Sequence, residues 1–185
     1  AQCLVGSEMC IRDRGFSVTY LQPDAEGRVS LEALQAALRP DTILVSIMMV
    51  NNESGAVMPI ERMARLTHRV CPNALFHTDA VQGFFKVPFR ARTLGADLIS
   101  VSAHKVHGIK GAGALYIRPG LSLPPFVLGG GQESGLRSGT ENTSGIAGMV
   151  AAVQSYPSDA MERMRSLKKL LLSLLTEALP ETTVA

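Results

Sequence analysis

The sequence has little cysteine, and its three cysteines, Cys3, Cys10 and Cys71, follow no regular spacing. An odd and irregular set does not make a disulfide framework and is typical of a reducing compartment, so we expect a cytoplasmic protein. Cys3 and Cys10 are also too far apart for a CxxC metal or redox motif. No secretory signal peptide is visible, because charged residues crowd residues 1–14.

The chain also lacks a large net charge and a long apolar run. Lysine and arginine number 18 against 16 aspartates and glutamates, and a net charge of +2 does not favour a nucleic-acid or anionic-membrane partner. No apolar run approaches the ~20 residues that a bilayer span requires. With 46% hydrophobic and 18% charged residues among 185, the composition is that of a globular domain with a sizeable core.

The first part of the chain divides into a featureless leader and an ordered region. Residues 1–14 show neither a clean period nor a helix cap, so we expect a non-native or flexible leader. Residues 16–21 alternate as a strand does, and a proline–glycine turn follows at residues 23–27. Ser30 is then placed to cap a helix, and the continuous apolar run at 42–50 predicts a strand buried on both faces.

Strands and helices alternate through the rest of the chain. Further strands are expected at 74–77, 97–101 and 114–118. Further helices are expected after Pro59, at about 142–154 and at about 159–179. This alternation predicts an α/β fold with a mainly parallel sheet flanked by helices.

Polar clusters follow three of the predicted strands. Asn51 and Asn52 end the first, Asp79 and Gln82 the second, and Ser102, His104 and Lys105 the third, ahead of a glycine-rich loop. Each residue alone is typical of an ordinary cap or a solvated loop. Because parallel strands place their carboxyl ends at one edge of the sheet, neighbours about 5 Å apart, we expect one shared crevice.

The chemistry of these side chains indicates a cofactor. A carboxylate can hold a protonated heteroaromatic nitrogen, and a lysine amine can bond to an aldehyde. A serine hydroxyl, an imidazole and nearby backbone amides can receive a phosphate. A small molecule with a pyridine nitrogen, an aldehyde and a phosphate is pyridoxal 5'-phosphate, and Asp79 would keep its ring nitrogen protonated so that the ring accepts electrons.

Four motifs in this order carry a family resemblance: residues 50–55 (VNNESG), 77–82 (HTDAVQ), 102–105 (SAHK) and 137–142 (RSGTEN). They resemble the cysteine desulfurases of the NifS/IscS group, class V aminotransferase-like enzymes of fold type I. The resemblance covers about residues 15–180. It implies a pyridoxal-phosphate-dependent homodimer that takes sulfur from L-cysteine, releases L-alanine, and passes the sulfur from an enzyme persulfide to an acceptor or iron–sulfur scaffold protein.

The resemblance assigns roles to individual residues. It implies that Lys105 bonds covalently to the cofactor aldehyde and that Asp79 pairs with the ring nitrogen. It also implies that Gln82 and Asn52 contact the ring hydroxyl. On this comparison residues 15–155 form part of the cofactor-binding large domain, and residues 156–185 lead to a small domain.

The same comparison assigns the phosphate contacts. Ser102 and His104 would hold the phosphate, and Thr140 would reach the phosphate bound by the other subunit. Lys105 and His104 would form the catalytic set. No metal is expected, since His104 and His107 lie three residues apart but no third ligand is obvious.

Parts of the family pattern are missing, so we expect a fragment that is inactive alone. The ring-stacking histidine cannot be placed, because His68 and His77 fall in a predicted helix and strand and are expected to be structural. The persulfide-forming cysteine loop and the arginine that grips the substrate carboxylate also lie outside the chain. Ser134 stands where the family pattern usually has arginine. Alternatives are a selenocysteine lyase or another class V enzyme, and, from another class, a non-catalytic scaffold or phosphate-binding module.

Overall fold

The computed structural model describes residues 11–181. Most of the predicted leader, with Cys3 and Cys10, lies outside the described residues. Residues 11–15 form a short helical turn that ends at Gly15, where the φ of +81° favours glycine. The predicted domain limits at residues 14 and 155 remain predictions.

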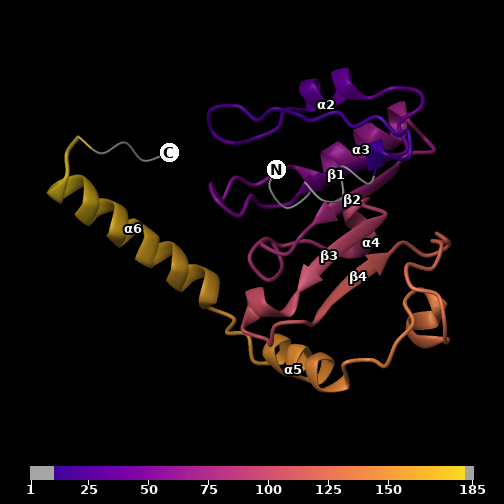
Figure 1. Ribbon diagram of the computed structural model, residues 1–185. Helices are drawn as coiled ribbons and strands as arrows, with labels where there is room; N and C mark the ends of the chain where they lie inside the picture. The colour runs from indigo at the N-terminus through magenta and orange to yellow at the C-terminus, as the bar shows by residue number, and fades with distance from the viewer. Residues whose placement is uncertain (1–10, 182–185) are drawn as a thin grey trace.

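A four-stranded sheet forms the centre of the fold (Figure 1). Its strands are β1 (Leu44–Met48), β2 (Leu75–Asp79), β3 (Leu98–Ser102) and β4 (Gly113–Ile117), in that spatial order. The pairs β1–β2 and β2–β3 are parallel, and β4 runs antiparallel to β3. The predicted α/β class with a mainly parallel sheet is confirmed.

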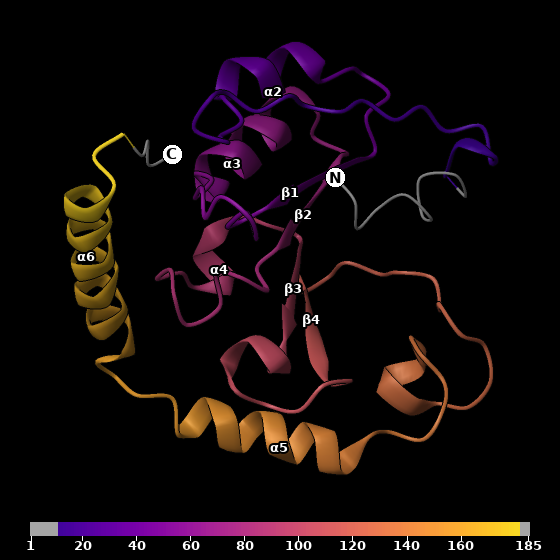
Figure 2. The ribbon, with the colours of Figure 1, turned by 60° about the vertical axis from the view of Figure 1, so that its left-hand side comes forward.

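The helices lie mainly on one side of this sheet. They are α2 (Leu31–Ala37), α3 (Ile60–Val70), α4 (Ala91–Leu94), α5 (Thr143–Gln154) and α6 (Ala160–Ala178), with short 3-10 helices η2 (Ala103–Val106) and η3 (Gln132–Gly135). Helix α3 packs on β2, and both α2 and α4 pack on α3. Helix α5 packs against η2, whereas α6 stands apart from the sheet (Figure 2).

The two faces of the sheet differ in character. One face carries alternate apolar residues such as Val45, Ile47 and Phe76, which are at most 9% exposed and pack with the apolar face of α3. The alternation of side chains along a strand places Ser46 and His77 on the opposite face. That second face is more open and more polar, and it includes the ends of β2 and β3. The prediction that the strand within residues 42–50 is buried on both faces is therefore wrong: Leu44 and Ser46 of β1 are exposed, because the core packs against the other face.

Local sequence signals account for the first helix. The Ser30 hydroxyl accepts a hydrogen bond from the Ala33 amide at 3.0 Å, as expected of a helix cap. Leu34 is 2% exposed and joins α2 to the core. The turn before the helix closes on the Asp24 carboxylate, which accepts from the Arg28 amide at 2.8 Å, and Gly27 has a φ of +74°.

The prediction of a strand at residues 16–21 is wrong. The segment pairs with no strand in the described part of the chain, and Phe16 and Tyr20 are 50% and 45% exposed. Alternation of side chains favours an extended backbone, but a strand also needs a hydrogen-bonded neighbour. Here the described segment passes outside the sheet, next to Arg39, whose guanidinium donates to Thr19 at 3.1 Å.

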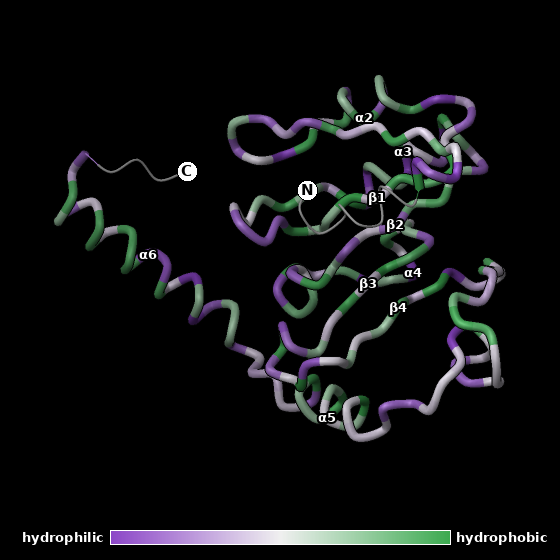
Figure 3. Tube along the Cα trace, in the orientation of Figure 1, coloured by the Kyte–Doolittle hydropathy of each residue, from purple (hydrophilic) through white to green (hydrophobic). Residues whose placement is uncertain are grey.

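Helix α6 is amphipathic, but its apolar side is exposed. Figure 3 shows hydrophobic and hydrophilic residues interleaved along it. Met164, Leu167, Leu171 and Leu174 recur at spacings of three and four residues and are 41–56% exposed. Between residues 11 and 181, no helix is long and apolar enough to cross a membrane.

Candidate functional site

The carboxyl ends of β1, β2 and β3 lie at one edge of the sheet, and the predicted site residues follow them. In the parallel register Met48 pairs with Asp79 and Asp79 pairs with Ser100. Paired residues share a face, and so do residues two apart along a strand, so Asp79 and Ser102 lie on the same face. The structure therefore brings the acid after β2 and the polar run after β3 to one edge and one face.

Two buried side chains, one alanine and one valine, hold the run after β3 in place. Ala103 and Val106 in η2 are both 0% exposed, and three-residue spacing puts them on one side of a 3-10 helix. His104 and Lys105 lie between these anchors and are exposed and half-buried, respectively. Burial of the anchors thus directs the imidazole and the amine away from the core.

A hydrogen bond and a glycine complete this turn. The Ser102 hydroxyl and His104 Nδ1 are 2.7 Å apart, which ties together the two predicted phosphate ligands. The Gly108 amide donates to the Ala103 carbonyl at 2.9 Å, and a Cβ on Gly108 would lie only 2.9 Å from the Ala103 Cβ. Only glycine lets the chain close this tightly behind Lys105.

Asp79 and Gln82 stand at the start of a turn segment after β2. The Asp79 carboxylate accepts from the Val81 amide at 2.9 Å, and its backbone carbonyl accepts from the Met49 amide at 2.8 Å. Gln82 is half-buried and accepts, through Oε1, a hydrogen bond from Lys86 Nζ at 3.4 Å. Lys86 is a site neighbour that the sequence reasoning missed, although its spacing of four residues from Gln82 could have indicated it.

Asn52 lies at the same edge, but in a separate turn. The turn is held by Asn51, whose side-chain oxygen accepts from the Glu53 and Ser54 amides at 2.9 Å each. Asn52 itself is exposed in this turn. Of the asparagine pair, therefore, Asn51 shapes the turn and Asn52 presents its amide to solvent near the strand end.

The structure does not bring Thr140 to the other site residues of this chain. Thr140 is exposed and precedes α5, whereas the carboxyl end of α5 leads to Tyr156, whose ring lies 6.0 Å from that of His107 next to η2. Twelve residues of helix separate the two ends, about 18 Å at the usual rise. The placement agrees with the expected role of Thr140 toward another subunit, which remains a prediction.

His77 connects the three parallel strands across the open face. Its Nδ1 lies 2.7 Å from the Ser46 hydroxyl, and its Nε2 lies 2.9 Å from the Ser100 hydroxyl. Burial lowers the pKa of His77 below its ordinary value, while the nearby charge of Asp79 opposes this shift. Both ring nitrogens are used within the sheet, in keeping with the expected structural role.

A second polar cluster lies at the opposite edge of the sheet. Asp97, 1% exposed, accepts from the Phe76 amide at 2.7 Å, from Arg118 Nε at 2.6 Å, and lies 2.8 Å from His68 Nε2. Burial favours a raised pKa for Asp97, but these three hydrogen bonds outweigh it and hold the pKa below its usual range. Sequence reasoning missed this cluster, which gives His68 its structural role.

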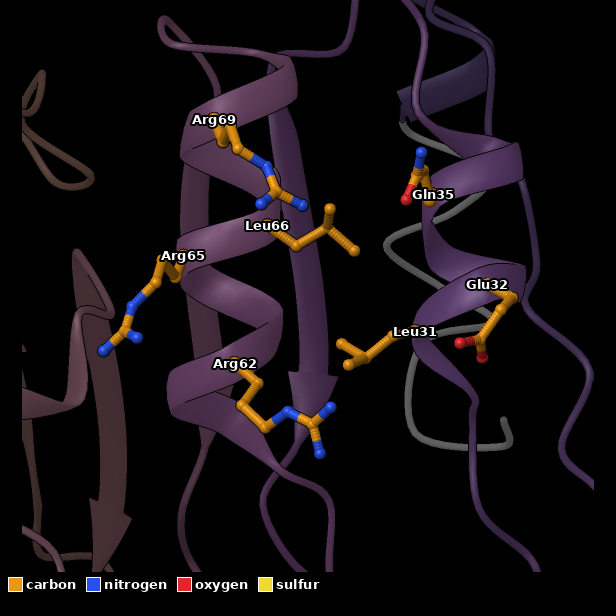
Figure 4. Close-up of a pocket in the computed structure, with 7 residues that line it drawn as sticks. All are labelled: Leu31, Glu32, Gln35, Arg62, Arg65, Leu66 and Arg69. Carbon is orange, nitrogen blue, oxygen red and sulfur yellow. The ribbon is translucent and has the colours of Figure 1, made fainter.

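Two hollows elsewhere in the described structure are lined by none of the predicted site residues. One of about 570 Å³ lies beside the Asp97 cluster. Another, of about 320 Å³, lies between α2 and α3 (Figure 4), where Arg62 and Arg69 extend toward α2 and Arg65 points away. Arg65 is already paired with Glu61 at 2.6 Å. The strand ends, rather than these hollows, collect the chemically distinctive side chains.

The side chains at the strand ends fit pyridoxal phosphate. A carboxylate, a primary amine and a linked hydroxyl–imidazole pair share one edge of the sheet, which are the groups needed for the ring nitrogen, the aldehyde and the phosphate. The amide of Gln82 stands between the acid and the loop that follows it. Each functional group of the cofactor therefore has a partner of the right chemistry.

Comparison with known proteins identifies the family of the chain. The aminotransferase class-V family model matches residues 3–184. Cysteine desulfurase from Cereibacter sphaeroides is 48% identical over 143 residues, covering 77% of this chain and 36% of the relative. The mitochondrial cysteine desulfurase of Eremothecium gossypii is 40% identical over 181 residues, covering 95% of this chain and 36% of the relative. The chain thus spans about a third of the length of these relatives.

Solved structures show the same fold. A NifS-like protein superposes with a TM-score of 0.88 at 41% identity, covering 96% of this chain and 49% of that protein. SspA in complex with cysteine gives a TM-score of 0.84 at 39% identity, covering 94% of this chain and 50% of SspA. The predicted partial aminotransferase-like large domain of fold type I is confirmed. On the family match, the sequence identities and the shared fold together, the chain belongs to the aminotransferase class-V family, among relatives named as cysteine desulfurases.

Proposed function

We propose that this chain is the cofactor-binding part of a pyridoxal-phosphate-dependent cysteine desulfurase. The observation that carries the proposal is the meeting of Asp79 and the Ser102–Lys105 run at one edge and on one face of the parallel sheet. Support comes from a family that depends on pyridoxal phosphate in general, and from relatives named cysteine desulfurase. The structure of SspA with cysteine supports L-cysteine as the substrate.

The overall reaction would convert L-cysteine and an acceptor thiol to L-alanine and a persulfide. The C–S bond of cysteine breaks, an S–S bond to the acceptor forms, and a proton takes the place of sulfur on carbon. Pyridoxal phosphate, when bound, supplies the electron sink for this cleavage. The residues of this chain would hold that group and move protons around it.

Each side chain contributes a distinct part. Lys105 would bond to the aldehyde and exchange protons at the substrate, with His104 beside it. Asp79 would pair with the ring nitrogen, and the hydrogen bond from the Val81 amide holds its carboxylate in place. Gln82 and Asn52 would donate to the ring hydroxyl.

The phosphate contacts divide between two subunits in this proposal. The hydrogen bond between Ser102 and His104 holds the two groups side by side, and both would contact the phosphate. Thr140 would serve the site of a second copy, because its own site is at the other end of α5. A homodimer, and a sulfur-accepting or iron–sulfur scaffold protein as partner in the cytoplasm, complete the proposal.

This chain by itself is not expected to turn over L-cysteine. Cys71, the cysteine that the structure describes, is 5% exposed, and its thiol donates to the Arg39 carbonyl at 3.1 Å. A thiol buried in this way cannot reach a ligand at the strand ends. Formation of a persulfide from L-cysteine by the isolated chain would contradict this expectation.

Cofactor binding can be tested with the chain itself. The protein is mixed with pyridoxal phosphate, the visible absorption band of lysine-bound cofactor is recorded, and borohydride reduction fixes the cofactor for peptide mapping. We expect the label on Lys105 and its loss in Lys105→Ala. Lys110→Ala, an exposed lysine five positions later in the glycine-rich loop, is the matched control and should keep the band. A colourless protein, or labelling shared among exposed lysines, would favour the scaffold alternative.

A further inference from the structure

Lys86 lies in a turn segment whose shape is closely determined. The segment leaves the carboxyl end of β2 through two successive turns, in which the Gly83 amide donates to Ala80 and the Lys86 amide donates to Gly83, both at 2.9 Å. A Cβ on Gly83 would lie 2.5 Å from Met49 Sδ, so the segment passes close over the core. These contacts fix the backbone that carries Lys86.

Aromatic contacts tie the same segment to the neighbourhood of η2. The ring of Phe85 lies 5.0 Å from that of Tyr156, and the ring of Tyr156 stacks on His107 at 6.0 Å. Phe85 adopts a φ of +62°, an unusual conformation for a residue other than glycine. The loop after β2 and the run after β3 are therefore one packed unit.

Lys86 is consequently near Lys105. Burial lowers the pKa of Lys86, and the positive charge of Lys105 lowers it further. Lys86 is half-buried and does not extend freely into solvent. Its ammonium instead donates to Gln82 Oε1 at 3.4 Å.

This hydrogen bond determines which way the Gln82 amide faces. An ammonium group has three donors and no acceptor, so only the carbonyl oxygen of the amide can face it. The NH₂ group of Gln82, on the other branch of the same planar amide, is then directed away from Lys86. A lone glutamine would have two nearly equivalent orientations, one donating and one accepting toward a ligand.

We propose that Lys86 is a positioning residue of the cofactor site, holding the oxygen of Gln82 so that its NH₂ group is presented to the ring oxygen of bound pyridoxal phosphate. The inference rests on the proposed function, since it concerns the same ligand. Lys86 acts through Gln82 in this role and does not itself bond to the cofactor.

A double-mutant cycle tests the inference in the full chain. Pyridoxal phosphate is titrated at fixed pH into the parent, Lys86→Met, Gln82→Ala and the double variant, and both the dissociation constant and the wavelength of the visible band are recorded. We expect Lys86→Met to weaken binding about 5-fold, the size of one modest hydrogen bond, and to shift the band as Gln82→Ala does. The double variant should bind no more weakly than Gln82→Ala alone.

Two further variants separate positioning from folding. Lys86→Arg should restore both the affinity and the band, because a guanidinium also only donates. Lys110→Met, which alters an exposed lysine outside the site, should change neither. Urea unfolding of each variant shows whether the fold is intact.

Several results would overturn the inference. One is that Lys86→Met binds pyridoxal phosphate with the affinity and the visible band of the parent. Another is that the losses of affinity caused by the two single substitutions multiply in the double variant. Failure of Lys86→Arg to restore the band would also count against it. If the unaltered chain shows no band at all, the proposed function itself fails and this inference fails with it, so the two failures are distinguishable.

Discussion

Replacement of Asp97 by asparagine tests how much the polar cluster at the amino ends of β2 and β3 contributes to stability. The carboxylate is 1% exposed and receives three hydrogen bonds, from a backbone amide of β2, from His68 in α3 and from Arg118 after β4. Asparagine preserves the shape but replaces one oxygen by an NH₂ group. At least one of the three donors then faces another donor.

The expected loss in the free energy of unfolding depends on the burial of Asp97 and on the exposure of its partners. Removing one member of a buried ion pair costs about 3–5 kcal/mol, because the other charge is left uncompensated. The side chains of Arg118 and His68 are 53% and 32% exposed, so water can replace part of what they lose. We therefore expect Asp97→Asn to lower the free energy of unfolding by about 3 kcal/mol, the lower end of that range.

Urea unfolding followed by circular dichroism measures this difference. Asp41→Asn is the matched control, because Asp41 is also paired with an arginine, at 3.0 Å from Arg39 Nε, but its side chain is 76% exposed. An exposed pair contributes about 0–1 kcal/mol, so the control should stay within that limit. A loss below about 1 kcal/mol in Asp97→Asn, with an unchanged denaturant slope, would refute the reasoning.

The difference in stability between the parent and Asp97→Asn should depend on pH. The pKa of Asp97 is lower in the folded protein than in the unfolded chain, so at acid pH the unfolded state binds more protons and stability rises with pH. The contribution is complete above the unfolded value of about 3.9 and is lost as pH falls through the lower folded value. The difference between parent and Asp97→Asn should therefore shrink as the pH falls below about 4.

Three other substitutions test neighbouring parts of the structure. Gly83→Ala should lower the free energy of unfolding by about 1–3 kcal/mol, because the new methyl group overpacks against Met49. Gly131→Ala is the control, since its methyl group would meet no neighbouring atom, and urea unfolding compares the two variants. Ser30→Ala should cost about 1 kcal/mol through loss of the α2 cap, and a loss below 0.3 kcal/mol would contradict the capping role. Because the folded pKa of His77 lies below its unfolded value of about 6.5, stability should fall as pH drops through that window, and His77→Asn should lose less between pH 7.5 and pH 5.

Much of the fold was predictable because its signals are local. A capping hydroxyl, a proline–glycine turn and a continuous apolar run depend only on near neighbours in the chain. The cap is found at Ser30, the turn at residues 23–27 and a strand at β1, although β1 is buried on one face and not on both. The parallel sheet then placed Asp79 and Lys105 at one edge without any knowledge of side-chain contacts. Topology alone was sufficient to bring these two residues to one edge, but it did not bring Thr140 there.

The remaining features depend on contacts between distant segments. Residues 16–21 have the alternation of a strand, but a strand exists only with a hydrogen-bonded partner, which periodicity does not reveal. His77 shows no sign in the sequence that it will bond to hydroxyls on both neighbouring strands. The environment of Lys86 likewise depends on the packing of a turn against Tyr156, more than 60 positions further along the chain.

The two polar clusters are linked through the register of the sheet. Asp97 donates its amide to the Phe76 carbonyl and accepts the Phe76 amide with its side chain, so β2 and β3 are locked together at their amino ends. A slip of one residue would turn every side chain of a strand to the other face. Asp79 and Ser102 share a face in the observed register and would lose it after a slip of one residue, and Ser102 lies about 17 Å along β3 from Asp97. The buried acid at one edge therefore supports the geometry of the other edge, and a loss of pyridoxal phosphate affinity in Asp97→Asn would be a consequence of register rather than of contact.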